Sequence, residues 1–380
     1  MKLSRIDTFA VAPRWLFVRV STDDGAEGWG EASLEGHAEA VEGAFEALKD
    51  RFLGTDPFRI EDIWQIAYRG GFYRGGPVLM SALSGLDQAL WDLKGKALGV
   101  PVWQLIGGKL RDKVEVYGWI GGDRPHEAAA GAKGRRDQGF RKVKMNATDD
   151  LGWLDSPKAL DVVLERVAAV QAVGMDVGLD FHGRVHRPMA KQLARELEPL
   201  KPLFIEEPLL SENVEGLKLL AQHTSIPIAL GERLYDRWDF KKIFHNDIAD
   251  IVQPDLSHAG GISECRRIAA MAETYDVAVA PHCPLGPLAL ASCLQLAACT
   301  PNIVLQEMSW GIHYNTGGFD LDTYLADPST FAVTDGMVAI PEGPGLGVTL
   351  DLDKVKEAAK DGHRWRNPVW RRPDGSFAEW

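Results

Sequence analysis

The sequence predicts an α/β protein in which a closed parallel barrel follows a separate N-terminal region. From about residue 114 onward, short apolar runs alternate with helical stretches, which is the pattern of βα units in a parallel sheet. There are eight such runs, which favours a closed barrel over an open doubly wound sheet, the alternative for this rhythm. The 380 residues exceed the roughly 250 of a typical barrel, so we expect additional structure at the ends.

The N-terminal region mixes two periodicities. Residues 16–31 alternate between apolar and polar, with a turn in the middle, which predicts a β-hairpin. Apolar residues at helical spacing follow over 35–53 and 60–100, and the glycine-rich stretch 69–77 interrupts the second run. We therefore expect an α+β unit over residues 1–113.

The barrel is expected over residues 114–319. Its eight predicted strands lie at 114–120, 140–146, 176–182, 203–208, 227–232, 250–255, 276–282 and 302–307. Seven predicted helices lie between them, at 126–138, 157–173, 189–198, 213–223, 237–245, 261–275 and 286–299. Residues 320–380 lose the alternation and are marked by Gly, Pro and Trp. We expect this last segment to fold back onto the N-terminal region.

Composition excludes several classes of protein. Lys and Arg number 42 against 54 Asp and Glu, a formal charge of −12, and no basic stretch indicates a nucleic-acid-binding face. No run approaches the about 18 apolar residues of a membrane span, and Asp7, Pro13 and Arg14 interrupt any N-terminal signal. Four cysteines without a C-x-x-C pair indicate reduced thiols, and hence a cytoplasmic protein.

In a parallel barrel the chemistry lies at the C-terminal ends of the strands. Strands two to eight each end in an ionisable residue: Lys144, Asp180, Glu206, Glu232, Asp255, His282 and Glu307. From Asp180 onward these residues recur at intervals of about 25 residues, roughly the length of one βα unit. The repetition predicts that they form a ring around a single site.

Three hard oxygen donors stand on adjacent strands of this ring: Asp180, Glu206 and Glu232. At about 4 Å and an effective dielectric near 20, each pair of carboxylates repels by roughly 4 kcal/mol, which a bound cation would remove. Oxygen ligands without cysteine favour Mg²⁺, with Mn²⁺ second. Glu207 is the alternative to Glu206, because neighbours on a strand face opposite sides and only one can reach the metal.

Two histidines of the ring suit acid–base chemistry. His182 and His282 lie on strands three and seven, so they can flank a substrate from opposite sides as general acid and general base. Asp255 precedes His282 by one βα unit and can hold its imidazole in one tautomer. Lys142 and Lys144 share a strand face. The sequence contains no phosphate-binding loop, nucleophile elbow or zinc pair.

The order Lys-x-Lys, Asp-x-His, Glu, Glu, Asp, His, Glu on successive strands resembles the enolase superfamily, and within it the mandelate racemase subgroup. The flanking segments are similar to the branch of the subgroup that dehydrates D-galactonate: 72–76, 178–185, 202–208, 253–261, 280–287 and 365–368. The resemblance covers essentially the whole chain. It implies a modified (β/α)7β barrel whose capping domain is built from the N-terminal region and the C-terminal segment.

The resemblance also implies a chemistry. Mg²⁺ would be held by the three acids, His282 with Asp255 would remove the C2 proton of a sugar acid, and His182 would protonate the departing C3 hydroxyl. Glu307 would hydrogen-bond the substrate carboxylate as it becomes an enediolate, and Lys144 occupies the position of a base in racemases of the subgroup.

Further contacts follow from position and resemblance. The substrate contacts would be Arg14, Asn146 and His313, with the loops near 14–15 and 68–74 closing over the site. A homo-oligomer is expected, as is common in the family. Dehydration of another aldonate (gluconate, mannonate or arabinonate), racemisation on the same scaffold, and a barrel that only binds its ligand remain the alternatives.

Overall fold

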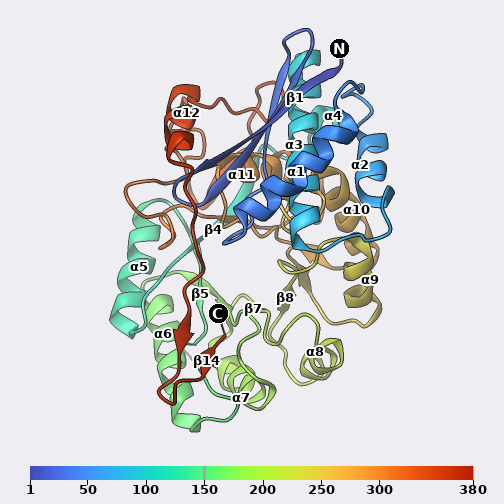
Figure 1. Ribbon diagram of the computed structural model, residues 1–380. Helices are drawn as coiled ribbons and strands as arrows, with labels where there is room; N and C mark the ends of the chain where they lie inside the picture. Colours follow the sequence, from blue (N-terminus) through green and yellow to red (C-terminus); the bar gives the residue numbers. More distant parts are fainter. Residues whose placement is uncertain (149–150, 380) are drawn as a thin grey trace.

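The structure is a computed structural model that describes residues 1–148 and 151–379 (Figure 1). Its N-terminal part contains an antiparallel sheet in the order β1-β2-β3, made of Leu3–Val11, Trp15–Thr22 and Glu27–Glu31. Helices α1 (Ala38–Phe52), α2 (Ile60–Arg69) and α3 (Pro77–Leu98) pack beside it. The expected hairpin thus corresponds to β2 and β3, the second and third strands of this sheet. Strand β1 was missed because its burial does not alternate regularly, with three half-exposed residues in succession.

Helix α3 lies directly on β3. A Cβ atom at Gly30 would come within 2.4 Å of the carbonyl oxygen of Gly85, and one at Gly28 within 2.1 Å of that of Ala89. The two glycines therefore allow a backbone-to-backbone approach that no larger residue permits. This part has its own apolar core, with Val41, Phe45 and Leu86 fully buried within it.

The eight predicted parallel strands are all present. They are β4 (Lys113–Trp119), β5 (Lys142–Asn146), β6 (Asp176–Asp180), β7 (Ile205–Glu206), β8 (Ile228–Leu230), β9 (Ile251–Val252), β10 (Ala278–Val279) and β11 (Gln306–Met308). They pair in parallel in the order β10-β9-β8-β7-β6-β5-β4-β11. A parallel bridge between Val279 and Ile303 joins the two ends of this path, which closes the barrel.

The helices of the barrel also fall where the periodicity predicts them. They are α5 (Pro125–Asp137), α6 (Asp161–Ala172), α7 (Arg187–Leu197), α8 (Val214–Ala221), α9 (Arg237–His245), α10 (Gly261–Thr274) and α11 (Pro287–Ala297). The short helices α4 (Val102–Ile106), η1 (Pro157–Leu160) and η2 (Glu198–Leu200) connect larger elements. No helix among the described residues is long and apolar enough to cross a membrane.

The C-terminal segment runs along both parts of the molecule. Strand β12 (Met337–Ala339) pairs antiparallel with β4, and α12 (Leu352–Asp361) lies beside β1 (Figure 1). Arg364 and Arg366 then form ion pairs with Glu42 and Glu39 of α1. The chain continues to a small hairpin near α6 and α7, formed by β13 (Trp370–Arg371) and β14 (Phe377–Ala378).

Candidate active site

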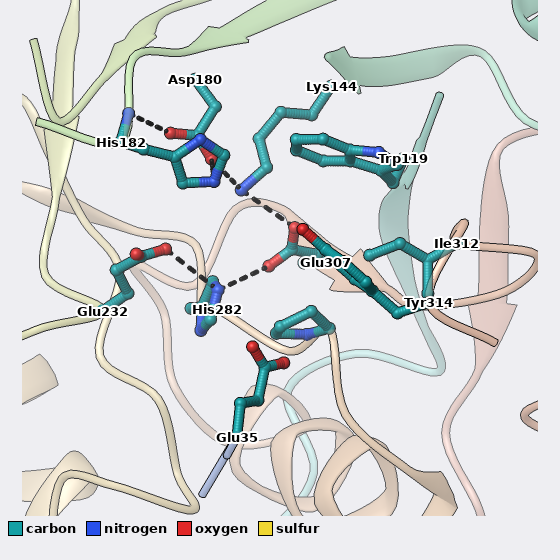
Figure 2. Close-up of a pocket in the computed structure, with 11 residues that line it drawn as sticks. Glu35, Trp119, Lys144, Asp180, His182, Glu232, His282, Glu307, Ile312 and Tyr314 are labelled. Carbon is teal, nitrogen blue, oxygen red and sulfur yellow. Dashed lines mark hydrogen bonds and ion pairs between the residues drawn. The ribbon is translucent and has the colours of Figure 1, made fainter. Parts of the chain in front are cut away.

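Five of the seven ionisable residues predicted at the strand ends line one cavity of about 70 Å³; Glu206 and Asp255 do not line it but contact residues that do. Figure 2 shows its walls, with Lys144 from β5, Asp180 from β6 and Glu307 from β11 pointing toward one another. The lining residues are Glu35, Trp119, Lys144, Asp180, His182, Glu232, His282, Pro284, Glu307, Ile312 and Tyr314. Most come from the barrel, and Glu35 comes from the N-terminal part.

Three carboxylates converge beside this cavity. Asp180, Glu206 and Glu232 each offer an oxygen atom, and these atoms lie within 4.8 Å of one another. Glu207 turns away, as expected for the neighbour of an inward-facing residue, and bonds to Ser211 Oγ at 2.8 Å and to Arg233. The structure thus brings Glu206, rather than Glu207, into the acid cluster.

Lys144 offsets part of the charge of the cluster. Its Nζ lies 2.7 Å from Glu206 Oε1, 3.2 Å from Asp180 Oδ2 and 3.0 Å from Glu307 Oε1. Burial by itself lowers the pKa of Lys144, but Glu206 and Glu307 attract its proton and raise the pKa well above the ordinary value. Its strand neighbour Lys142 instead pairs with Glu115, outside the residues that line the cavity.

The same cluster suits a hard divalent cation. Burial is the largest cause that raises the pKa of Glu206 well above its ordinary range, and repulsion from Asp180 is the next. The ionised form of Glu206 is therefore unfavourable without a positive partner. Oδ2 of Asp180 is buried and accepts no well-aligned hydrogen bond within the described residues, although Lys144 Nζ and His182 Nε2 each lie 3.2 Å from it. A set of three carboxylates is the donor chemistry of Mg²⁺ and Mn²⁺, and a divalent charge at this point would relieve the repulsion.

His282 and Asp255 form a hydrogen-bonded pair at the edge of the cluster. His282 Nδ1 lies 2.8 Å from Asp255 Oδ2, and its Nε2 lies 3.0 Å from Glu232 Oε2. Asp255 is fixed in turn, because its Oδ1 accepts a hydrogen bond of 2.6 Å from the backbone N–H of Ser257. Burial lowers the pKa of His282, but Glu232, Glu307 and Asp255 together raise it well above the usual value.

His182 lies on another wall of the cavity, just beyond the end of β6 (Figure 2). Its backbone is left-handed, with φ of 51°, and its N–H donates to Asp180 Oδ1 at 2.9 Å. This turn brings its Nε2 to 3.2 Å from Asp180 Oδ2. Burial lowers the pKa of His182, and the carboxylates of Asp180 and Glu232 offset part of that shift. A left-handed non-glycine residue is strained, and such strain is typical of functional sites.

Comparison with known proteins places this geometry in a family. Residues 127–355 match the model of the enolase C-terminal domain-like family, and residues 6–107 match the N-terminal domain of mandelate racemase and muconate lactonizing enzyme. The chain belongs to the enolase superfamily. The resemblance of its motifs to that superfamily is therefore confirmed, as is the modified barrel with an additional N-terminal α+β domain.

Relatives within the superfamily match over the full length. The chain is 55% identical to a D-galactonate dehydratase of Pectobacterium atrosepticum and 53% identical to one of Ralstonia pickettii, covering 100% of both partners in each case. A solved structure of an enolase from Agrobacterium radiobacter, described with bound Na and L-malate and an ordered active site, is 33% identical with a TM-score of 0.88. It covers 100% of both chains.

Of the three predicted substrate contacts, two line a cavity and one does not. Asn146 and His313 line a second cavity of about 260 Å³, which adjoins the first and shares His182 and Tyr314 with it. Arg14 is different, because its side chain is fully buried and does not line the first cavity. Arg14 is held behind the wall by Glu35, by the carbonyl oxygen of Pro284 and by the ring of Tyr314. Arg14 is thus absent from the lining of the first cavity, and its contact with the substrate stays a prediction.

Other lining residues were not predicted. Glu35, Ile312 and Tyr314 follow no strand-end rule, since they lie on loops outside the regular βα spacing. His258 is buried beside the histidine–aspartate pair, with Nδ1 2.9 Å from Ser81 Oγ and Nε2 3.7 Å from Asp255 Oδ2. Its position three residues after Asp255 was the available signal. The loop expected to cover the site contributes no residue to this cavity within the described part, and its Phe72 is 99% exposed.

Proposed function

We propose that this protein dehydrates a sugar acid, and that D-galactonate is its substrate. The observation that carries the proposal is the convergence of three functions on one cavity: a carboxylate cluster, the His282–Asp255 pair and a second imidazole at His182. The choice of D-galactonate rests on the relatives of that name, which are more than half identical to this chain over its full length. A protein that only binds its ligand has no use for two separately placed imidazoles.

Asp180, Glu206 and Glu232 would hold Mg²⁺. When bound, the ion supplies a positive charge where negative charge builds on the substrate carboxylate during proton removal. The chain itself carries a net charge of −12, so its own long-range field repels an anionic acid. Lys144 is the positive side chain that the barrel adds at this point, held among Asp180, Glu206 and Glu307.

His282 would take the proton from C2. The hydrogen bond of 2.8 Å between its Nδ1 and Asp255 leaves Nε2 as the nitrogen that faces the cavity. The carboxylate partner fixes this tautomer and stabilises the imidazolium that forms. A general base placed in this way contributes about 10²–10⁴ in rate.

His182 would return a proton on another side of the substrate. The departing C3 hydroxyl needs that proton to leave as water, and an enol remains that tautomerises to a 2-keto-3-deoxy acid. Glu307 is suited to hydrogen-bond the substrate carboxylate, since its side chain lines the cavity between Lys144 and His282. Asn146 and His313, on the adjoining cavity, are suited to the distal hydroxyls.

Racemisation would need a second base in place of the acid. Lys144 stands at the position of that base in racemases of the subgroup, but here it contacts three carboxylates, and Glu206 and Glu307 raise its pKa despite burial. These three carboxylates engage the amine of Lys144. This contact pattern favours dehydration.

The test is an assay of the purified protein with Mg²⁺ and D-galactonate, beside gluconate, mannonate, arabinonate and aldarates, for 2-keto-3-deoxy acid. We expect product from D-galactonate. Product from another sugar acid alone would keep the chemistry and overturn the substrate. Exchange of the C2 hydrogen in deuterated water without loss of water would indicate a racemase instead.

A further inference from the structure

The short segment after His282 is held at every residue. Four side chains, two from the end of β11 and two from the N-terminal region, each bond to one backbone group of residues 283–286. Glu307 Oε2 accepts from Cys283 N at 2.9 Å, Arg14 Nη2 donates to Pro284 O at 2.7 Å, Ser309 Oγ donates to Leu285 O at 2.6 Å, and Glu31 Oε1 accepts from Gly286 N at 2.8 Å. Two of these four, Arg14 and Glu31, come from the N-terminal domain rather than from the barrel.

Glu31 makes the most of these contacts. It ends β3 and is 0% exposed, and its second oxygen accepts another backbone hydrogen bond, from Ala289 N at 3.0 Å. Its carboxylate therefore caps the first turn of α11, where free N–H groups and the helix dipole favour an acceptor. Ser33 Oγ donates to the same carboxylate at 2.7 Å, which orients it.

The approach between the two domains is close at this point. A Cβ atom on Gly286 would lie 2.7 Å from Glu31 Oε2 and 2.8 Å from Trp15 Cδ2. The backbone of Gly286, with φ of −86° and ψ of −174°, suits any residue, so only space excludes a side chain here. The sequence thus leaves room at Gly286 for the N-terminal domain to touch the loop of His282.

Arg14 reinforces this contact through a second hydrogen bond to the loop, at Pro284. Its guanidinium is fully buried, pairs with Glu35 and lies 4.7 Å from the centre of the Tyr314 ring. Those partners aim the group at Pro284, which is two residues from His282. A planar guanidinium held in this way positions a backbone carbonyl more firmly than a flexible ammonium could.

We propose that Glu31 and Arg14 are positioning residues through which the N-terminal domain holds the imidazole of His282 in place. The inference rests on the proposed function of His282 as the base. Asp255 anchors the ring of His282 at Nδ1. The position of the ring in the cavity depends as well on the backbone of residues 282–286, from which the side chain extends. A misplacement of about 1 Å at a reacting group can cost about 10²-fold in rate.

The test compares Glu31→Gln with Asp92→Asn as a matched control. Asp92 is also a buried carboxylate of the N-terminal domain, and it accepts 2.8 Å hydrogen bonds from Trp29 N and Leu346 N, away from the loop of His282. We expect Glu31→Gln to lower kcat by about 10- to 100-fold with KM within about twofold, while the folded Asp92→Asn variant keeps its kcat. Equal kcat in Glu31→Gln and the wild type would overturn the proposal.

Two further variants test the same contact independently of Glu31. Arg14→Lys keeps the positive charge but loses the planar guanidinium, and we expect a fall in kcat. A rise in KM alone would show that Arg14 binds substrate instead. Gly286→Ala keeps both anchors but forces them apart from the loop, and we expect the same fall in kcat. Unchanged kcat in Gly286→Ala would count against close domain contact as the cause.

A readout without turnover separates this inference from the proposed function. In protein labelled with nitrogen-15 histidine, the ring resonances of His282, assigned with His282→Asn, report its hydrogen bond to Asp255. We expect them to move in Glu31→Gln and to stay in place in Asp92→Asn. If the wild type neither turns over nor exchanges any sugar acid, the proposed function fails, but the resonances still decide whether Glu31 positions His282.

Discussion

Two groups of buried carboxylates in this protein are satisfied in different ways. In the site, Asp180 and Glu206 are at most 1% exposed and lie with Glu232 so that three oxygens fall within 4.8 Å of one another. At the contact between the N-terminal domain and the barrel, the acids are as deeply buried but lie apart, and each accepts hydrogen bonds from backbone N–H groups of distant segments: Glu31, Asp87 and Asp92.

This difference distinguishes buried carboxylates that join distant segments from buried carboxylates that gather around a site. Backbone hydrogen bonds offset part of the cost of burying each interface carboxylate, although burial still raises the pKa of Glu31 and Asp87 to about 7. In the site, burial and then repulsion from Asp180 raise the pKa of Glu206. Burial also acts on Asp180 and Glu232, but nearby histidines outweigh it and lower the pKa of both, so the cluster depends on positive partners. The interface acids thus tie distant segments of the chain together, whereas the site acids converge on one another in a set that suits a divalent cation.

The largest effect is expected when the chemistry is removed and both groups of acids stay intact. His282→Asn should abolish turnover and C2 hydrogen exchange, a loss of about 10³-fold or more, because the general base is gone. His182→Asn should stop dehydration but retain exchange at C2, since only the acid is lost. Deuterium incorporation measured by NMR in deuterated water distinguishes the two variants.

Two results would contradict this assignment. Retained exchange in His282→Asn would remove that histidine as the base, and normal turnover in His182→Asn would remove that histidine as the acid. Asp92→Asn serves as the control, because Asp92 contacts Trp29 and Leu346 and neither imidazole.

A smaller effect should appear in stability when Mg²⁺ is added. A ligand at about 100 times its Kd stabilises the folded state by about 2.7 kcal/mol, so Tm of the wild type should rise with Mg²⁺ and fall back with a chelator. Glu232→Gln removes one donor of the site group and should lose most of this rise. Asp87→Asn alters the interface group and should keep it, whatever its own Tm. An equal rise in both variants would place the cation elsewhere.

The strand-end residues could be predicted because one spacing recurs along the chain. Each βα unit returns the chain to the same end of the barrel, so Asp180, Glu206, Glu232, Asp255 and His282 could be expected to meet without any knowledge of their contacts. The same rule chose Glu206 over Glu207, and the structure places Glu206 with the other two acids. The strands and helices of the barrel followed from hydrophobic periodicity for the same reason.

The contacts between the domains could not be predicted in this way. Glu31 and Gly286 are 255 positions apart, and no period relates a strand of the N-terminal sheet to a loop of the barrel. The burial of Arg14 behind Tyr314 depends on how two distant loops pack, which no local pattern in the sequence shows. Strand β1 was missed because an irregular burial pattern leaves little periodic signal.

The smallest effect concerns the interface acids alone and depends on pH. Burial raises the pKa of Asp87 from 3.8 to about 7, although Ser263 donates two hydrogen bonds to it. Between these two values the folded protein holds a proton that the unfolded chain has released, so the contribution of Asp87 to stability is present at low pH and declines as pH rises through about 7. Asn cannot titrate, so Asp87→Asn should lack this decline.

We therefore expect the difference in unfolding free energy between wild type and Asp87→Asn to shift by about 2 kcal/mol between about pH 5 and about pH 8, in favour of the variant at high pH. Urea unfolding at a series of pH values measures it. The shift should be the same with and without Mg²⁺, because Asp87 bonds to Ser263 and does not belong to the acid cluster of Asp180, Glu206 and Glu232. A difference independent of pH would mean that Asp87 is already ionised at low pH and that its hydrogen bonds outweigh its burial. Asp87 would then be ionised in the folded protein, as the site acids are when they bind a cation. The two groups of acids would differ only in how their carboxylates are arranged.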